Sequence, residues 1–457
     1  MRTSNVVSAA LLASSATAAP LSISSLLGGL ITSVTSDLNT LLGDLGISLR
    51  TNASAHGAVV PFSSQCPLPI QPVTLNTTRY SHDLTWPLGV NGGQFINWTT
   101  FKANGANLGG WLEKEKTHDP IWWDQYAPNA PDEWTFCQTL GSQCGPVLEA
   151  RYASFLNTST IDLLASVGVN TLRIPTTYQA WVNVPGSALY HGNQQSYLRT
   201  ITQYAIEKYN MHIIIGLHSL PGGVNNLDIG EALFHDGWFY NTTNLDYSFQ
   251  AIDQILNFIV GSTHTNAFTI APINEASDNL ASFGSPDGLS TNATNWILTY
   301  MDGVFEKVEK LDRRIPVMLQ DCFKGPSFWS PLFASGHNLV MDTHVYYFAA
   351  AGAYANYILP AVCGQAAYLQ NSENKFPIFV GEWSLQTQYN NTLAGRKTLF
   401  DTQRYAWSKY LSGGTFWTAV SYSNTTVDGE GDQEDYWSYV DLINEGVITS
   451  QTTDSYC

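Results

Sequence analysis

The stretch FPIFVGEWS, residues 376–384, joins a short apolar run to a glycine and a carboxylate. The run from Phe376 to Val380 is aromatic and β-branched, and it lies between Lys375 and Gly381, which is typical of a strand buried on both faces. A charge at the end of such a strand is either paired for stability or required for chemistry. Glu382 alone does not decide between the two, but repetition of the pattern along the chain would favour chemistry.

The pattern recurs in seven other apolar runs that carry a polar or aromatic group near the C-terminal end. They are ANLGGWL (106–112), TLRIP (171–175), HIIIGLH (212–218), FTIAPINE (268–275), PVMLQD (316–321), LVMDTHVY (339–346) and GTFWTAV (414–420). Between them lie helical patterns with apolar residues at steps of three and four, at 161–167, 197–209, 247–260, 296–311 and 402–411. Eight strand–helix units predict an α/β protein, a (β/α)8 TIM barrel with its site at the C-terminal face. A doubly wound open sheet would gather its site at one switch point instead.

Length and composition fit one catalytic domain with an N-terminal extension. The chain has 457 residues, of which 44% are hydrophobic, enough for a single barrel. Residues 1–18 contain one positive charge, an apolar stretch and an Ala-Thr-Ala site, which predicts a secretory signal peptide. Residues 19–65 are rich in Ser, Leu, Thr and Gly, as in a propeptide or linker. We therefore expect the catalytic barrel to occupy residues 66–457.

Sequons and cysteines agree with an exported, extracellular protein. Eight Asn-X-Ser/Thr sequons occur, at Asn52, Asn76, Asn97, Asn157, Asn241, Asn292, Asn390 and Asn424. Six scattered cysteines favour three disulfides over a metal site, with Cys137 and Cys144 close enough to pair locally. The C-terminus lacks the hydrophobic tail of a lipid-anchor signal. We expect a secreted monomer, either free or associated with a cell wall.

The charge of the chain restricts its partners. The formal net charge is −17 and only 12% of the residues are charged, which argues against nucleic acid and against anionic membrane surfaces. The chain also contains 14 Trp and 23 Tyr, and aromatic rings pack well on the apolar faces of sugars. A neutral carbohydrate, such as a β-glucan or another β-glucoside, is the expected substrate. No cofactor and no metal are expected.

Two glutamates are placed for glycoside hydrolysis. Glu275 and Glu382 end the fourth and seventh runs, so they should face one cavity about 5 Å apart, the spacing at which one carboxyl protonates a leaving oxygen while the other attacks the sugar carbon. Arg173 on a neighbouring strand should lower the pKa of Glu382 and keep it ionised. Asn274 is suited to bind the 2-hydroxyl of the sugar in the transition state.

Other strand-end residues complete the candidate site. His344 and Tyr346 could orient the two glutamates, and Trp417 could form a floor under the sugar ring. Taken singly, His218 and His344 would be interpreted as structural histidines and Arg173 as a structural ion pair. The chain contains no His-Glu-x-x-His zinc motif, no Gly-x-Ser-x-Gly elbow and no dinucleotide-binding glycine fingerprint.

Taken together, these residues resemble the set shared by glycoside hydrolase family 5. In chain order the set is Arg173, His218, Asn274, Glu275, His344, Tyr346, Glu382 and Trp417, and the resemblance covers roughly residues 103–420. NLGGWL (107–112), RIP (173–175) and GEWS (381–384) resemble the fungal exo-β-1,3-glucanase branch. The resemblance implies retaining hydrolysis, with Glu275 as acid/base, Glu382 as nucleophile and Glu115 near the terminal sugar.

Departures from this branch bear on the substrate. Ala276 replaces the usual proline after the acid/base, and EKEKTHD (113–119) replaces the LEPW stretch of this branch. Only 34 residues separate Glu382 from Trp417, where the exo-glucanases tend to carry a long, cysteine-containing insertion. A phenylalanine pair that holds the leaving sugar is matched by Phe323, whereas Leu227 stands where its partner would be expected. A glucan β-1,3-glucosidase is the first hypothesis. The related diglycosidases, which release a disaccharide such as rutinose from plant flavonoids, are the alternative.

A third hypothesis is a barrel that has lost catalysis and binds carbohydrate in the wall. Replacement of Glu275 or Glu382 by a neutral residue would be its signature, and both glutamates are present.

Overall fold

The computed structural model describes residues 94–453 and 455–457. The predicted signal peptide (1–18), the predicted extension (19–65), the boundary at residue 66, and Cys66, Asn52 and Asn76 lie outside the described residues. These assignments stay predictions.

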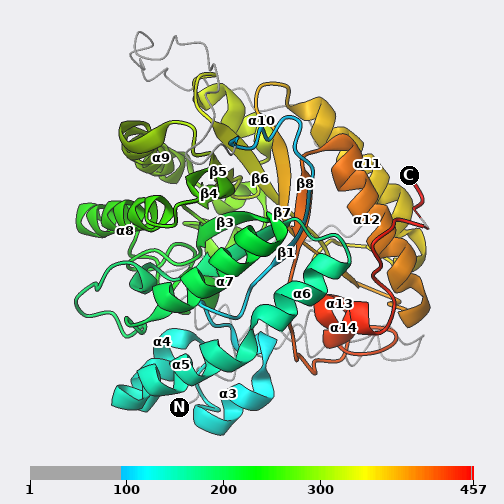
Figure 1. The fold of residues 1–457 in the computed structure, drawn as a ribbon, viewed down its shortest axis with the longest axis horizontal. Helices are drawn as coiled ribbons and strands as arrows, with labels where there is room; N and C mark the ends of the chain where they lie inside the picture. The colour runs from blue at the N-terminus through cyan, green and yellow to red at the C-terminus, as the bar shows by residue number, and fades with distance from the viewer. Residues whose placement is uncertain (1–93, 454) are drawn as a thin grey trace, which may run out of the picture. The chain divides into compact units, whose positions relative to one another are not determined.

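The centre of the structure is a closed barrel of eight parallel strands in sequence order (Figure 1). The strands are β1 (Ala103–Asn107), β2 (Thr171–Thr176), β3 (His212–Leu217), β4 (Phe268–Ala271), β5 (Val317–Gln320), β6 (Leu339–Tyr347), β7 (Ile378–Thr387) and β8 (Gly413–Phe416). The barrel closes where Ala103 of β1 pairs with Gly413 of β8. The predicted (β/α)8 fold is confirmed, and each of the eight apolar runs contributes to one strand. β1 begins three residues before its run.

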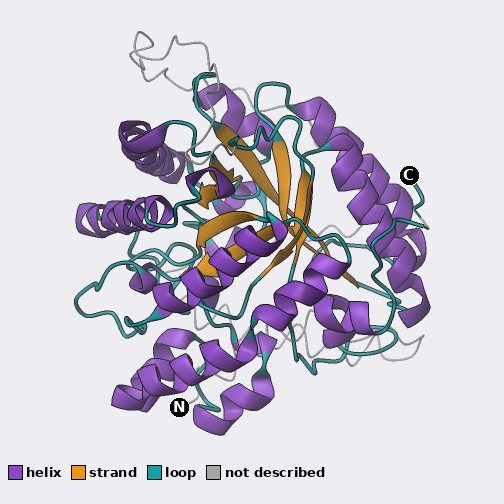
Figure 2. Cartoon of the chain, in the orientation of Figure 1, coloured by secondary structure: helices purple, strands orange, loops and turns teal. Residues whose placement is uncertain are grey.

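Helices surround the strands, which are drawn in orange within a purple ring in Figure 2. They are α3 (Pro120–Tyr126), α4 (Glu133–Leu140), α5 (Cys144–Phe155), α6 (Thr158–Ser166), α7 (Gln194–Tyr209), α8 (Thr242–Val260), α9 (Thr291–Asp312), α10 (Pro326–Trp329), α11 (Ile358–Ser372), α12 (Arg396–Tyr410), α13 (Glu434–Trp437) and α14 (Tyr439–Asn444). In α8, the side chain of Asn241 caps the first turn by accepting from Thr243 N and Asn244 N. Its buried face includes Leu245 and Ile252, which packs the helix on the barrel.

One layer of side chains inside the barrel is apolar. Its side chains come from six strands and are covered by Trp98: Ala103, Ile214, Ala271, Met318, Val340 and Phe379. This filled layer means that a ligand can enter only from the C-terminal ends of the strands, where the polar residues gather.

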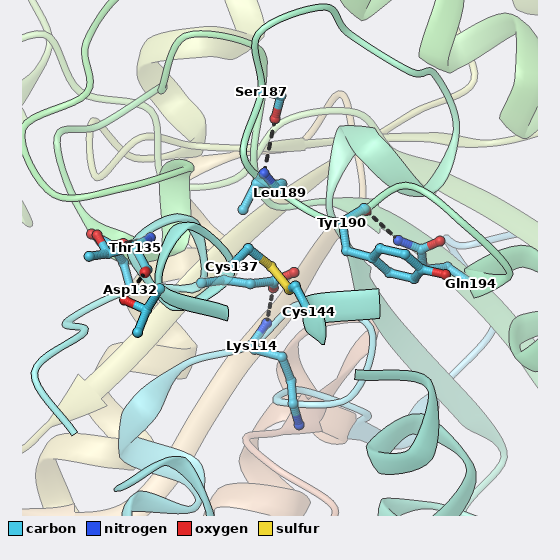
Figure 3. Close-up of a disulfide and its surroundings, with 11 residues drawn as sticks. Lys114, Asp132, Thr135, Cys137, Cys144, Ser187, Leu189, Tyr190 and Gln194 are labelled. Atoms are coloured by element: carbon cyan, nitrogen blue, oxygen red, sulfur yellow. Dashed lines mark hydrogen bonds between the residues drawn. A yellow bond between two sulfur atoms is a disulfide. The ribbon is translucent and has the colours of Figure 1, made fainter. Parts of the chain in front are cut away.

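The β1–α5 region carries one disulfide and the start of the site. Cys137 in the last turn of α4 is bonded to Cys144 at the start of α5, as predicted (Figure 3). In the same region, Lys114 N donates a 2.8 Å hydrogen bond to the Oε2 atom of Glu133 on α4. The helices that follow β1 therefore fix the loop that leads to Glu115.

A second disulfide joins Cys363 of α11 to Cys457, 94 residues later. Cys322 is buried and forms no disulfide with any other described cysteine. The expected third bridge cannot be assigned within residues 94–457. None of the described helices is both long and apolar enough to cross a membrane.

Candidate active site

Two carboxylates face each other at the C-terminal ends of the strands. Glu275 follows β4 with a backbone φ of 44°, and Glu382 lies in β7. Both are buried, and one carboxylate oxygen of each lies within 4.8 Å of the other and of a ring nitrogen of His344. Retaining glycosidases hold their carboxyl groups about 5–5.5 Å apart, whereas inverting enzymes need about 6.5–9.5 Å to admit a water molecule. The spacing is that of a retaining site.

Arg173 of β2 connects Glu382 to the amide residues of the site. Its Nη1 atom donates to Oε1 of Glu382 at 2.7 Å and to Oδ1 of Asn107 at 2.9 Å, and its Nη2 atom donates to Oδ1 of Asn274 at 2.9 Å. Burial lowers the pKa of Arg173, but the charges of Glu382 and Asp342 more than offset this effect, so the pKa lies above its ordinary value. The guanidinium is a permanent cation, and it leaves the Nδ2 donor of Asn274 available to a ligand.

His344 of β6 lies between the two carboxylates. Its Nδ1 atom is 2.6 Å from Oε1 of Glu275 and 3.4 Å from Oε2 of Glu382. Burial lowers the pKa of this imidazole, but the charge of Glu382 and contacts with Asp342 and Glu275 raise it to about 10. The ring is therefore a second buried cation at neutral pH.

The prediction that the pKa of Glu382 lies below its ordinary value is wrong. Burial raises this pKa above its ordinary value, although the charges of His344 and Arg173 oppose the effect. The sequence indicated that Arg173 would lie beside Glu382, but it did not indicate how deeply the carboxylate is buried. Tyr346 OH also donates a 2.9 Å hydrogen bond to Oε2 of Glu382 and favours its ionised form.

His218 and Trp417 form one wall. The two rings are stacked, with an interplanar angle of 11° and centroids 5.6 Å apart. The Nε2 atom of His218 is 3.2 Å from Nη1 of Arg173, and burial together with the charge of Arg173 holds the pKa of His218 well below its ordinary value. A neutral imidazole therefore faces the guanidinium.

These groups open onto a cavity of about 280 Å³. Seven of the ten predicted site residues line it: Glu115, His218, Asn274, Glu275, Tyr346, Glu382 and Trp417. Arg173 and His344 contact the carboxylates without lining the cavity. Sequence reasoning missed eight further lining residues: Thr117, His118, Ile229, Phe348, Ser421, Ser423, Gln433 and Trp437. Thr117 and His118 lie in the EKEKTHD stretch that already stood out, but the others had no periodic or motif signal.

Glu115 lies beside groups that the sequence did not single out. Nε2 of His118 is 3.3 Å from Oε1 of Glu115. Burial, together with the charge of Glu115, raises the pKa of Asp228 to about 7. Glu115 lines the cavity, so its carboxylate oxygens can accept hydrogen bonds from sugar hydroxyls.

Phe323 does not line the cavity but flanks Glu275. The Oε1 atom of Gln320 accepts from Glu275 N at 3.1 Å and from Cys322 N at 2.8 Å, which ties the Phe323 loop to the backbone of Glu275. The ring of Phe323 meets the edge of Phe283, with centroids 5.4 Å apart. The phenylalanine that packs against Phe323 thus comes from the β4–α9 connection.

Glu275, His344 and Glu382 form the one group among the described residues whose atoms could surround a metal ion. Their hydrogen bonds fit a proton-transfer site instead. Nδ1 of His344 faces both carboxylates and Nε2 lies 3.5 Å from Nη2 of Arg173. A protonated imidazole has no lone pair to offer a metal.

Comparison with known proteins agrees with this geometry. No family model matches the chain. The chain is 28% identical over 346 residues to the probable glucan 1,3-beta-glucosidase A of Aspergillus niger, covering 73% of this chain and 75% of that protein. It is 30% identical over 258 residues to glucan 1,3-beta-glucosidase 1 of Schizosaccharomyces pombe, covering 55% and 60% of the two chains.

A solved structure is more similar. The rutinosidase of Aspergillus niger is 48% identical, with a TM-score of 0.76, and the alignment covers 78% of this chain and the whole of that one. Both enzyme types named from the sequence are thus represented among the relatives. The chain belongs to glycoside hydrolase family 5, and it is a retaining β-glycosidase.

Proposed function

We propose that Glu382 is the nucleophile and Glu275 the acid/base. In the first step, Glu382 attacks the anomeric carbon while Glu275 gives its proton to the departing oxygen, forming a glycosyl ester on Glu382. In the second, Glu275 takes a proton from water, the water oxygen bonds to the anomeric carbon, and the ester bond breaks. The spacing within 4.8 Å supports this assignment.

Neighbouring groups have supporting roles in this proposal. The guanidinium of Arg173 and the hydroxyl of Tyr346 hold Glu382 in its ionised, attacking orientation. Nδ2 of Asn274 donates to the sugar 2-hydroxyl. Trp417 packs against the sugar ring, and Glu115 binds the hydroxyls farthest from the bond that is cleaved.

The sugar unit released is, in this proposal, a β-linked disaccharide on a neutral aglycone. The observation that carries it is the polar extension of the cavity, by which we mean the hydroxyl and amide groups that Thr117, Ser421, Ser423 and Gln433 add to its lining. Such groups suit a second sugar ring, because sugars are recognised by hydrogen bonds and aromatic packing. The 48% identity with a rutinosidase supports the same substrate class.

Release of glucose from β-1,3-glucan is the second candidate, as the sequence first indicated. It is favoured by the curated relatives, which are glucan 1,3-beta-glucosidases. In that case the polar extension would hold water or a glucan branch.

A comparison of rutin and laminarin as substrates, made with one enzyme preparation, decides between the candidates. Release of intact rutinose from rutin, with little glucose from laminarin, supports the diglycosidase. Glucose from laminarin as the dominant product replaces it with the glucanase. Inactivity on both substrates by folded protein would support the non-catalytic carbohydrate-binding hypothesis.

We further propose that the protein is secreted as a monomer. The six sequon asparagines within the described residues are all exposed, which supports passage through a glycosylating pathway. Glycopeptide mass spectrometry of the secreted protein, with its N-terminal sequence, tests this together with cleavage after Ala18.

A further inference from the structure

Asp342 is a buried carboxylate without a role in the mechanism above. It lies in β6 between the apolar layer and the catalytic glutamates, and its exposed fraction is 0%. Neither of its carboxylate oxygens has a hydrogen-bond partner among the described residues. A side chain at Gly381 would overlap the carboxylate, so the glycine leaves room for it.

Two cations flank this carboxylate. Its Oδ2 atom is 3.8 Å from Nε of Arg173 and 3.8 Å from Nε2 of His344. The Nε atom of Arg173 also lacks a hydrogen-bond partner. Charges this deep are compensated mainly by one another, because burial has removed most of their hydration.

The charges can be balanced in only one way that also permits catalysis. Arg173 and His344 contribute two positive charges, whereas Glu275, Asp342 and Glu382 could contribute three negative ones. One carboxyl must therefore carry a proton if the cluster is to be neutral.

The contacts indicate which carboxyl carries it. A protonated Asp342 would bury an O–H donor with no acceptor in reach, which is costly. Glu382 accepts hydrogen bonds from both Arg173 and Tyr346, which stabilise its charged form. Glu275 contacts Nδ1 of His344 through Oε1 alone, at 2.6 Å, and it lines the cavity, so a proton on its other oxygen can reach the leaving oxygen.

Other titratable groups do not change this balance. His218 is neutral, and Asp321 accepts from the backbone N of Phe323. Burial raises the pKa of Asp321 to about 6, so this carboxyl is mostly uncharged below that pH. The groups around Asp342 are, strand by strand, Arg173 (β2), His218 (β3), Glu275 (after β4), Asp321 (after β5), His344 and Tyr346 (β6) and Glu382 (β7).

We propose that Asp342 is a positioning residue whose fixed negative charge keeps one proton on the pair of catalytic glutamates, and that Glu275 holds this proton in the resting enzyme. The inference rests on the proposed roles of the two glutamates, and it holds for either candidate substrate.

Asp342→Asn tests this, since it removes the charge and keeps the shape. The two cations would then be balanced by ionised Glu275 and ionised Glu382, so Glu275 would no longer carry the proton that it gives to the leaving group. The value of kcat/KM should fall about 100-fold or more for a phenyl glycoside, which needs the acid, and less than about fivefold for a dinitrophenyl glycoside, which does not. The alkaline limb of the pH profile should move to lower pH.

Asp342→Glu is the matched control because it keeps the charge. In this variant, the ratio of kcat/KM for the phenyl glycoside to kcat/KM for the dinitrophenyl glycoside should stay at the wild-type value, even if altered packing lowers both constants. An unchanged ratio in folded Asp342→Asn, or an equal change in Asp342→Glu, would overturn the proposal.

A spectroscopic measurement covers the case in which Asp342→Asn does not fold. The infrared difference spectrum between the wild-type enzyme and Glu275→Gln, taken at the working pH, should contain the band of a protonated carboxyl, and the subtraction removes the bands of other buried carboxyls such as Asp228. A difference spectrum that contains a carboxylate band instead places the proton elsewhere and refutes the inference. Kinetics of Glu275→Ala with the same two substrates separate this failure from failure of the proposed catalytic roles.

Discussion

The hydroxyl of Ser423 donates a 2.7 Å hydrogen bond to the side-chain oxygen of Gln433. The Thr117 hydroxyl lies 3.5 Å from the same oxygen. The carboxamide nitrogen of Gln433 makes no hydrogen bond to another described side chain, so its N–H donors remain available to a ligand in the cavity that Gln433 lines. This arrangement makes Gln433 a candidate for recognition of a second sugar.

Gln433→Ala should therefore lower kcat/KM for a disaccharide glycoside such as rutin by about 10-fold or more, the effect of losing one hydrogen bond of about 1.5 kcal/mol. The corresponding monoglucoside should be affected less than about threefold. Kinetics with this pair of substrates check the prediction, and equal losses on both would show that Gln433 acts only on the structure of the loop.

Replacement of the proposed nucleophile should stop turnover but not folding. Glu382→Gln keeps the volume of the side chain and removes the attacking charge, so activity should fall below detection while ligand binding persists. Glu275→Ala should regain activity with azide on activated substrates, since azide needs no general base. Proton NMR of the first product formed by the wild-type enzyme should show retained configuration, and an inverted product would contradict both assignments.

Tyr346→Phe removes one hydrogen bond to Glu382 and little else. A hydrogen bond to a charged group contributes about 1.5–3 kcal/mol, so kcat/KM should fall about 10- to 150-fold. The loss should be similar for phenyl and dinitrophenyl leaving groups, because the nucleophile is needed for both. A leaving-group dependence like that expected for Asp342→Asn would argue that Tyr346 acts on the acid instead.

His344 predicts loss of stability at alkaline pH. Its pKa is raised by folding from 6.5 to about 10, so its contribution is fully present below about pH 6.5 and is lost as the pH rises through 10. The Tm of the wild-type enzyme should fall over this interval. His344→Gln should show a flatter dependence, and an equally steep curve would assign the effect to other groups.

The two disulfides should differ in their contributions. The Cys363–Cys457 bridge closes 94 residues and the Cys137–Cys144 bridge closes seven. The chain-entropy model then predicts that the free energy of unfolding falls by about 4.7 kcal/mol when Cys363 and Cys457 are replaced by serine. It predicts a fall of about 2.4 kcal/mol when Cys137 and Cys144 are replaced. Urea unfolding of the two double variants measures the order, which would be reversed if native packing around α4 and α5 dominates.

The sequence predicted the barrel because strand ends leave a local signal. A run such as FTIAPINE is apolar until its polar residues emerge at the mouth, and this holds for every strand regardless of what packs against it. The parallel order and the meeting of Glu275 with Glu382 then follow from closure of eight units.

Other features depend on contacts between distant segments. Trp437 reaches the site because its backbone oxygen accepts from Thr418 N across a loop, and Phe283 meets Phe323 from another connection. No periodicity marks either pair. The raised pKa of Glu382 likewise depends on burial, which a list of neighbouring charges does not contain. Asp342 stood within a quoted strand, but the sequence did not single it out because its partner Arg173 lies on β2, far away in the chain.

The polar cavity extension and the buried charge cluster are built from different parts of the chain. Thr117, Ser423 and Gln433 lie in connections, and among the described residues none of them hydrogen-bonds to Glu275 or Glu382. Evolution can therefore exchange the β8 connection between relatives without disturbing the proton balance in the barrel. The same modularity gives protein engineers a route to glycosidases with new sugar preferences, by transplanting that segment into a catalytic barrel left intact.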